Sequence, residues 1–321
     1  MRHLRFAVGV IVFIALAACE SKDAKPGSSA APKGAKADEA SAEQVAKETR
    51  GKVNCPAKIA TPVAAGGPVI DVVGLRPGLT YEEAANIVLC DHPLLVVQLD
   101  TSRLFNIQTY GATVRQGFGA RFAEARVVKT SKQIMQEMQD ASLARGSNAV
   151  QRDMKPGQIK YYVGTMGLPS QERVLYATRE EWFAEGKNPA VDTVVKALTG
   201  KYGDPTRAFD RQQRVRVLEW AYDLNGRRLT ETSPLYMRCN GVADPNEATR
   251  FSPDCGVVVQ AQVMRTPGNE GLAQYIQVGV IDQAAGYATI TGTEGALRKL
   301  DEDRKAKEIN DATKNATRPK L

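Results

Sequence analysis

The chain has 321 residues, of which 43% are hydrophobic and 25% are charged, and its formal net charge is +7. This composition is ordinary for a globular protein and allows one large domain or two modest ones. Histidine is present only as His3 and His92, and no H-E-x-x-H pattern occurs, which excludes a site built from several histidine ligands. We therefore expect neither a metal ion nor another cofactor.

The N-terminus carries basic residues and then an apolar run of 13 residues from Phe6 to Ala18. A membrane-spanning helix needs about 20 residues, so this run is too short to be one. Its end, Leu16-Ala17-Ala18-Cys19, resembles the lipobox of bacterial lipoproteins. The resemblance implies that residues 1–18 are a signal peptide and that Cys19 is the lipidation site and the only membrane attachment. An ordinary secretory signal, cleaved after the same small residues, is the alternative.

Residues 19–52 are rich in Ala, Lys, Ser, Gly and Glu and carry few large apolar side chains. Such a segment cannot bury enough surface to order itself, so we expect an acylated, disordered tether. Residues 41–50 have at most a transient helical tendency. Ordered structure is expected to begin near Cys55.

Four cysteines remain once Cys19 is set apart, an even number that suits an oxidising compartment. Four cysteines allow three pairings. We favour Cys55–Cys90 with Cys239–Cys255, because each pair closes a short loop inside one module. By loop entropy each bond would stabilise the fold by about 3–4 kcal/mol. The rival, a metal–thiolate site, lacks a C-x-x-C pair.

The N-terminal module is expected over 53–150. A strand is predicted over 68–75, then a helix whose start carries a capping box of Thr80 and Glu83, then a strand over 94–99.

Residues 103–130 alternate basic and aromatic side chains, and 116–122 faintly resembles an RNA-recognition signature. The leading basic residue and the aromatic spacing of that signature are missing. We expect a strand or loop that buries Phe118 and Phe122, and no nucleic-acid binding. A helix over 131–144, with Ile134, Met135, Met138 and Leu143 on one side, closes the module.

The C-terminal module is expected over 151–292. Strands are predicted over 159–166 and 173–177, a helical turn over 178–183, and a helix opened by Pro189 that ends at Gly200 or Gly203. Four alternating segments then predict an antiparallel meander: 214–224, 227–237, 257–264 and 275–281. Residues 293–321 should form a charged helix, docked by Leu297 and Leu300, and a tail.

Two segments of the chain echo each other: 74–90, and 191–205 leading into Trp220-Ala221-Tyr222. This pattern is similar to the small outer-membrane lipoproteins of the β-barrel assembly machinery and to the β-lactamase-inhibitor-like fold to which they belong. The resemblance implies an α+β class with antiparallel sheets and helices packed on one face. We expect this fold as one domain or two tandem modules behind the N-terminal tether.

Few side chains form a recognisable catalytic pattern. His92 follows the Cys90 helix and would need a nucleophile and an orienting acid, so a surface-loop role is favoured. The adjacent pairs Glu82-Glu83 and Glu180-Glu181 suit helix N-termini better than paired acid–base chemistry. The aromatic residues Trp182, Trp220 and Tyr222 form a candidate binding surface, with burial in the core as the alternative.

These observations favour a non-catalytic, membrane-anchored envelope lipoprotein that binds a protein or peptidoglycan partner in envelope assembly or maintenance. The resemblance implies the outer membrane facing the periplasm, and Glu20 after the acylated cysteine agrees with the sorting habit of that family. The alternative is a periplasmic hydrolase, with two carboxylates about 5–10 Å apart in a cleft, or an enzyme inhibitor at the cell surface.

Overall fold

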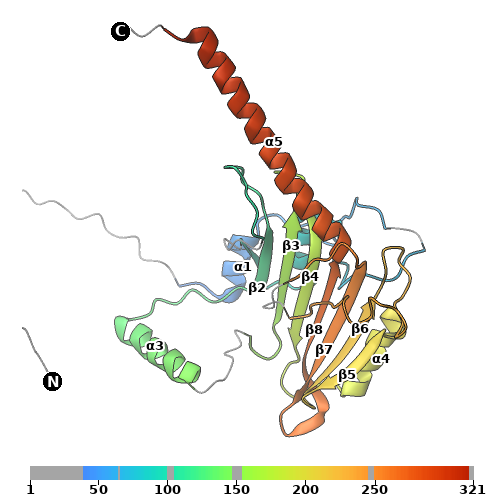
Figure 1. Ribbon diagram of the computed structural model, residues 1–321. Helices are drawn as coiled ribbons and strands as arrows, with labels where there is room; N and C mark the ends of the chain where they lie inside the picture. The colour runs from blue at the N-terminus through green and yellow to red at the C-terminus, as the bar shows by residue number, and fades with distance from the viewer. Residues whose placement is uncertain (1–38, 64–65, 100–104, 147–153, 245–248, 318–321) are drawn as a thin grey trace, which may run out of the picture. The chain divides into compact units, whose positions relative to one another are not determined.

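The computed structural model describes residues 39–63, 66–99, 105–146, 154–244 and 249–317. Within them, one eight-stranded antiparallel sheet, ordered β1-β2-β3-β4-β8-β7-β6-β5, forms the centre (Figure 1). The predicted α+β class is confirmed. The strands are β1 (Leu95–Leu99), β2 (Gly117–Phe122), β3 (Ile159–Met166), β4 (Arg173–Trp182), β5 (Arg207–Arg211), β6 (Val215–Ala221), β7 (Val257–Thr266) and β8 (Asn269–Asp282). The helices are α1 (Ala42–Arg50), α2 (Tyr81–Asp91), α3 (Ser131–Gly146), α4 (Val191–Tyr202) and α5 (Gln283–Asn315).

The sheet consists of two repeats, each a helix followed by four strands. Helix α2 precedes β1 to β4, α4 precedes β5 to β8, and the last strand of each repeat pairs with that of the other. The seam runs from Tyr176 opposite Ile281 to Trp182 opposite Tyr275. From either edge of the sheet to the seam, the strands therefore follow the order first, second, third and fourth of one repeat. The first strand of each repeat, β1 or β5, is an edge strand.

The expected module boundary at residue 150 does not fall between the repeats. Strand β2 pairs directly with β3, so that Phe118 lies opposite Val163 and the first repeat continues to Trp182. The loop-like composition of 145–157 belongs to an excursion between β2 and β3 that contains α3. The repeats meet instead between β4 and α4.

Both repeat helices pack on one face of the sheet, called here the helical face. Helix α2 lies against β1, β3 and β4, and α4 lies against β7 and β8. The capping box of α2 is confirmed: Thr80 Oγ1 accepts from the Glu83 N–H, and the Glu83 carboxylate accepts from the Thr80 N–H. Helix α4 ends as predicted at Gly203, whose φ is 79°.

The opposite face is covered by a loop that we call the strap, residues 223–244 and 249–256. Its residues Leu229, Val242 and Phe251 pack with side chains of β7 and β8 and with the first turns of α5. The strap lies so close to β8 that a Cβ on Gly279 would stand 1.9 Å from the Val242 carbonyl oxygen. Only glycine fits there.

Two disulfides join the pairs favoured from the sequence, Cys55–Cys90 and Cys239–Cys255, and each has a Cα–Cα distance of 5.5 Å. The first ties α2 to the chain that enters before it. The second closes the strap at its base. Each bond therefore fixes one long connection, the first before α2 and the second between β6 and β7.

The expected tether does not extend to residue 52, because α1 is ordered and packed. Ala46 is buried against Val96 on β1. The Arg50 guanidinium donates to the carbonyl oxygens of Leu89, His92 and Pro93, which caps the end of α2. Alanine side chains bury little surface, so the composition of α1 does not indicate that this helix packs on the fold. The hydrogen bonds of Arg50 hold it there. Residues 19–38 of the expected tether lie outside the described residues.

Three other expectations were wrong. Residues 68–75 form no strand but a tight turn, and 227–237 form turns, so that β5 rather than a returning strand lies beside β6. Residues 178–182 continue β4 instead of forming a helical turn. The capping-box pattern there is overridden because Thr178 and Glu180 have cross-strand partners on β8.

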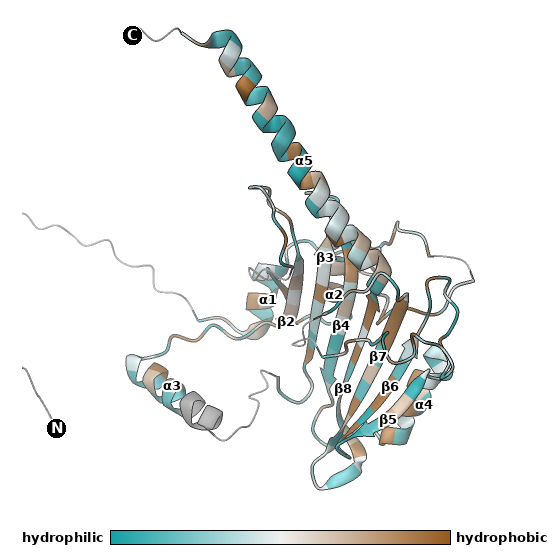
Figure 2. Cartoon of the chain, viewed as in Figure 1, coloured by the Kyte–Doolittle hydropathy of each residue, from teal (hydrophilic) through white to brown (hydrophobic). Residues whose placement is uncertain are grey.

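Helix α5 begins ten residues before its predicted start, at Gln283. Leu297 is buried at 3% exposure as expected, but Leu300 is 57% exposed, which corrects its predicted docking. Figure 2 shows that the outer part of this helix is largely hydrophilic. Among the described residues, no helix is long and apolar enough to span a membrane.

Candidate functional site

The three aromatic residues of the predicted binding surface do not lie together. Trp220 and Tyr222 are buried on the helical face, where Trp220 Nε1 donates to the Gly203 carbonyl oxygen at 2.9 Å. Trp182 lies on the opposite face, stacked on Tyr275 with 4.8 Å between ring centroids. These residues therefore form two separate packing clusters and no common surface.

A groove of about 370 Å³ lies on the helical face over the seam between β4 and β8. Helix α4, which packs against β7 and β8, borders the groove along its length. Its floor comes from Arg179, Ile276 and Val278, and one wall comes from successive turns of α4. The α4 residues are Thr193, Val194, Ala197, Leu198, Lys201 and Tyr202.

The other wall is a strained turn formed by Val72 and Val73. Val72 and Leu75 exchange two backbone hydrogen bonds, of 2.8 and 3.0 Å, around Val73 and Gly74. Both central residues are left-handed, with φ of 52° and 83°. Asn-Gly usually occupies such a turn, and a β-branched residue in this region is an outlier. Val73 is nevertheless 46% exposed at the groove rim.

Asp71 holds this turn against α4. Its carboxylate accepts the Gly74 N–H at 2.8 Å and forms an ion pair with Lys201 Nζ at 2.9 Å. The Tyr202 hydroxyl donates to the Asp71 carbonyl oxygen at 2.8 Å. The turn and the helix that form the two walls are thus joined by two polar contacts, from Lys201 and from Tyr202 to Asp71.

A polar cluster closes one end of the groove. Arg179 donates to the Tyr161 hydroxyl at 2.9 Å and to Glu181 at 2.5 Å, and lies 3.4 Å from Asp91 Oδ2. The Tyr161 hydroxyl donates to Asp91 at 2.7 Å. Burial raises the pKa of the Tyr161 hydroxyl. These contacts hold Arg179, Tyr161 and Asp91 in fixed positions at this end of the groove.

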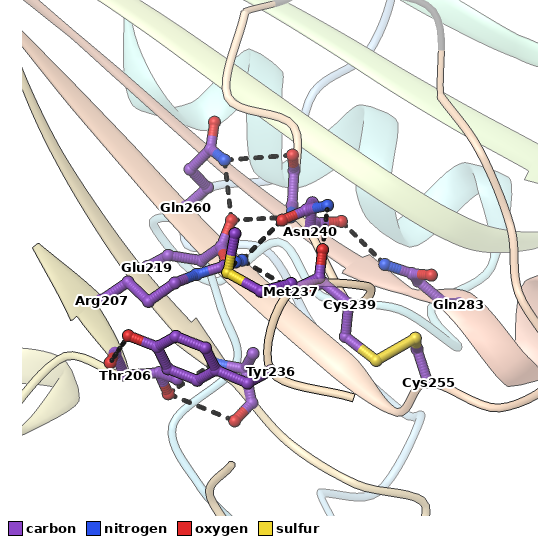
Figure 3. A network of polar contacts seen from close by, with 12 residues as sticks. Thr206, Arg207, Glu219, Tyr236, Met237, Cys239, Asn240, Cys255, Gln260 and Gln283 are labelled. Carbon is purple, nitrogen blue, oxygen red and sulfur yellow. Dashed lines mark hydrogen bonds and ion pairs between the residues drawn. A yellow bond between two sulfur atoms is a disulfide. The ribbon is translucent and has the colours of Figure 1, made fainter. Parts of the chain in front are cut away.

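The strap face carries a second polar network, centred on the buried Glu219 (Figure 3). Its carboxylate accepts from Arg207, from the Gly241 N–H at 2.9 Å and from Gln260 Nε2 at 2.8 Å. Arg207 also donates to Asn240 Oδ1 at 2.6 Å, and burial lowers the pKa of this guanidinium. The network joins edge strand β5 to the strap, so its role is structural.

Glu180 and Glu219 are the buried carboxylates of this face, yet they do not form an acid–base pair. Glu180 accepts from Trp182 Nε1 at 2.6 Å and from Gln277 Nε2 at 3.0 Å. Strands β8 and β7 separate it from Glu219, a distance of roughly 14 Å at ordinary strand spacing. Paired glycosidase carboxylates stand about 5–10 Å apart. Glu181, next in sequence, points to the helical face.

His92 lies at the end of α2, where its ring stacks on Phe122 with 4.3 Å between centroids. Its Nδ1 accepts the Leu94 N–H at 3.1 Å, and burial lowers its pKa. These contacts give the histidine a packing role at the helix end. Over the described ranges, no group of three His, Cys, Asp or Glu residues could hold a metal ion.

No protein family model matches the chain, and no curated protein or solved structure matches it. The functional argument therefore rests on the groove and its strained rim. The sequence predicts neither, because the pattern over residues 68–75 favours a strand. A glycine three residues after Asp71 was the available signal, since Asp can stabilise a turn through the N–H groups that follow it.

Proposed function

We propose that this chain is a non-catalytic lipoprotein of the bacterial envelope that binds a partner protein in the groove at the repeat seam. Anchoring would occur through Cys19, whose sequence context resembles a lipobox. The two disulfides support an oxidising compartment such as the periplasm. The outer membrane, facing the periplasm, is the proposed site of action.

The exposed and strained Val73 is the observation that carries the binding proposal. A residue held in a sparsely populated backbone region costs about 1–3 kcal/mol, and such residues cluster at functional sites. Here the strain presents an apolar side chain to solvent at the rim of an apolar groove. Stability alone would favour asparagine at this position, so the valine is best explained by a contact with a bound partner.

The lining of the groove favours a protein segment over a glycan of the cell wall. Valine, leucine, isoleucine and phenylalanine side chains dominate it, and its charged lining residues are Arg179, Glu181 and Lys201. Its volume is at the lower end of the range for small-molecule sites. The proposed occupant is a short apolar segment of another envelope protein, with polar groups that meet Lys201 and Glu181.

Site-specific photo-crosslinking in intact envelopes tests this function. A photoreactive residue at Val73 and another at Thr193 lie on opposite walls, so both should join the same partner protein. Phe209, exposed on edge strand β5, provides a control position outside the groove. The adduct should disappear when Ala197→Trp fills the groove. Adducts that persist in that variant, or that form equally at Phe209, would contradict the proposal.

The anchor has its own test. Cys19→Ser should abolish lipid labelling and release the protein from membranes, because the acyl chains supply nearly all the affinity at about 0.8 kcal/mol per buried methylene. Unchanged fractionation of this variant, together with absent lipid labelling of the wild type, would overturn the lipoprotein assignment.

A further inference from the structure

The segment from Val127 to Met138, which includes the first turns of α3, exposes five large apolar side chains within 12 residues. Within α3 these side chains follow the spacing i, i+1 and i+4, which places them on one side of the helix. Their exposed fractions lie between 46% and 67%. The exposed residues are Val127, Val128, Ile134, Met135 and Met138.

This segment starts where the N-terminal arm joins the fold. Ala40 and Arg126 form an isolated antiparallel bridge, with N–H to carbonyl distances of 3.0 and 2.8 Å in the two directions. An ion pair between Arg126 and Glu48 of α1, at 3.0 Å, reinforces this junction. The chain that comes from Cys19 therefore enters directly beside Val127, the first residue of the apolar segment.

The charge around the segment is positive. Between residues 121 and 139, four basic residues (Arg121, Arg126, Lys129 and Lys132) face two acidic ones (Glu124 and Glu137), which leaves a net charge of +2. Lys129 and Glu137 form an ion pair at 2.7 Å and Arg126 pairs with Glu48, which leaves Arg121 and Lys132 against Glu124, a net charge of +1. Exposed apolar side chains with flanking cations are typical of helices that lie in the interface of an anionic membrane.

We propose that residues 127–138 form a membrane-contact segment that lies on the anionic lipid surface to which the chain is tethered. This inference rests on the proposed anchor at Cys19, which would hold the segment near lipid at a high effective concentration. A weak intrinsic affinity then suffices, since the second contact is intramolecular. The segment would orient the sheet relative to the membrane, a task that a single lipid attachment cannot perform.

Vesicle binding by the unacylated mature chain, residues 19–321 with Cys19→Ser, tests the segment without the anchor. The protein should sediment with vesicles of phosphatidylethanolamine and phosphatidylglycerol, and much less with vesicles of phosphatidylcholine. Met135→Gln combined with Met138→Gln should weaken binding by about tenfold or more, because both substitutions replace an apolar side chain that would enter the lipid interface by a polar one. Ile309→Gln, an equally exposed apolar residue on α5, is the matched control and should bind as the parent does.

Equal binding by the double variant, or no binding to anionic vesicles, would overturn the inference and leave the anchor untouched. Conversely, vesicle binding combined with absent lipid labelling at Cys19 would remove the anchor and keep the segment. A photoreactive residue at Met135 in intact envelopes should react with lipid. If it reacts with a protein instead, the segment is a protein-docking helix and the membrane inference fails. Identical far-ultraviolet circular dichroism of all variants verifies that the fold is intact.

Discussion

At the scale of single residues, the unusual feature is an apolar side chain that is both strained and exposed. Val73 occupies the left-handed region because Asp71 binds the next N–H and is itself held by Lys201 and Tyr202. The neighbours determine the backbone conformation, and the valine adds only a cost to stability. Stability and binding should therefore respond in opposite directions to its replacement.

Val73→Asn should raise the free energy of unfolding by about 1 kcal/mol, since asparagine adopts left-handed backbone conformations more readily. The same substitution should weaken the partner adducts formed at Thr193. Urea denaturation and crosslinking measure the two effects. Val69→Asn, at an exposed valine outside the groove lining, serves as the control and should leave crosslinking unchanged. A loss of stability in Val73→Asn would refute the strain argument.

We expect the free energy of unfolding at acidic pH to depend measurably on the protonation of the Glu83 carboxyl group. Burial raises its pKa, but hydrogen bonds from the Thr61 hydroxyl and from the N–H groups of Thr80, Thr61 and Ala60 outweigh this and lower the pKa from 4.5 to about 2. Because the folded-state pKa is depressed, the stabilisation is present above the unfolded value and is lost as pH falls from about 5 toward 2.

Glu83→Gln should therefore lower the unfolding free energy at pH 7 by about 1–2 kcal/mol, through loss of the capping box and of the contacts to residues 60 and 61. Its stability should also fall less steeply than that of the wild type between pH 5 and pH 2. Glu302→Gln, at an exposed residue of α5, is the control. Parallel pH profiles for wild type and Glu83→Gln would disprove the assignment.

At the scale of elements, the strap is held by a disulfide, a polar network and one close backbone approach. The Cys239–Cys255 bond closes its base, and Glu219, Arg207 and Asn240 fasten it to edge strand β5. Edge strands expose unpaired backbone groups, and β5 is short and charged, which discourages pairing with other chains. The strap thus closes one face while β5 remains a poor template for aggregation.

Gly279→Ala should destabilise the protein by about 3 kcal/mol, because the added Cβ would stand 1.9 Å from the Val242 carbonyl oxygen and force the strap away from β8. Gly200→Ala in α4 is the matched variant, since nothing lies within 4 Å of its Cβ. It should stabilise the protein by about 0.5–1 kcal/mol. Thermal unfolding of both variants measures the contrast, and equal effects would contradict the close approach.

At the scale of the whole molecule, the two repeats share one sheet and one main hydrophobic core. Leu79 and Val88 of the first repeat belong to the same cluster as Leu198 and Trp220 of the second. The β4–β8 seam is also a full antiparallel pairing and not a loose contact between domains. Neither repeat keeps a closed core without the other.

We expect both repeats to unfold in one cooperative transition. Calorimetry should give equal calorimetric and van't Hoff enthalpies, and probes placed on α2 and α4 should report the same midpoint. Distinct midpoints for the two helices would show that the seam does not couple the repeats.

Local signals in the sequence predicted much of this fold. Thr80 with Glu83, the valine stripe of α4 and the alternation along β7 and β8 each act over a few residues, and each was interpreted correctly. The cysteine pairs were predicted because their loops are short. Sequence reasoning failed where distant partners decide the outcome. Glu180 favours a strand because Gln277, nearly a hundred positions later, donates to it.

The groove could not be predicted from the sequence for the same reason, since residues far apart in the chain form it. Its walls come from Val72–Val73 and from α4, more than a hundred residues apart, and its floor is the pairing of β4 with β8. No local pattern specifies that the last strands of the two repeats are neighbours. A turn that carries valine in place of asparagine also gives no ordinary turn signal.

The palindromic strand order gives a single chain the geometry of a two-fold dimer. In a dimer of identical subunits, a groove on the symmetry axis must have identical walls, and its ligand meets the same surface twice. Joining the repeats in one chain removes that constraint, so each wall can change independently. Here the wall from the second repeat is a helix, whereas the other is a single strained turn. The two orientations of a ligand in this groove would therefore meet different contacts.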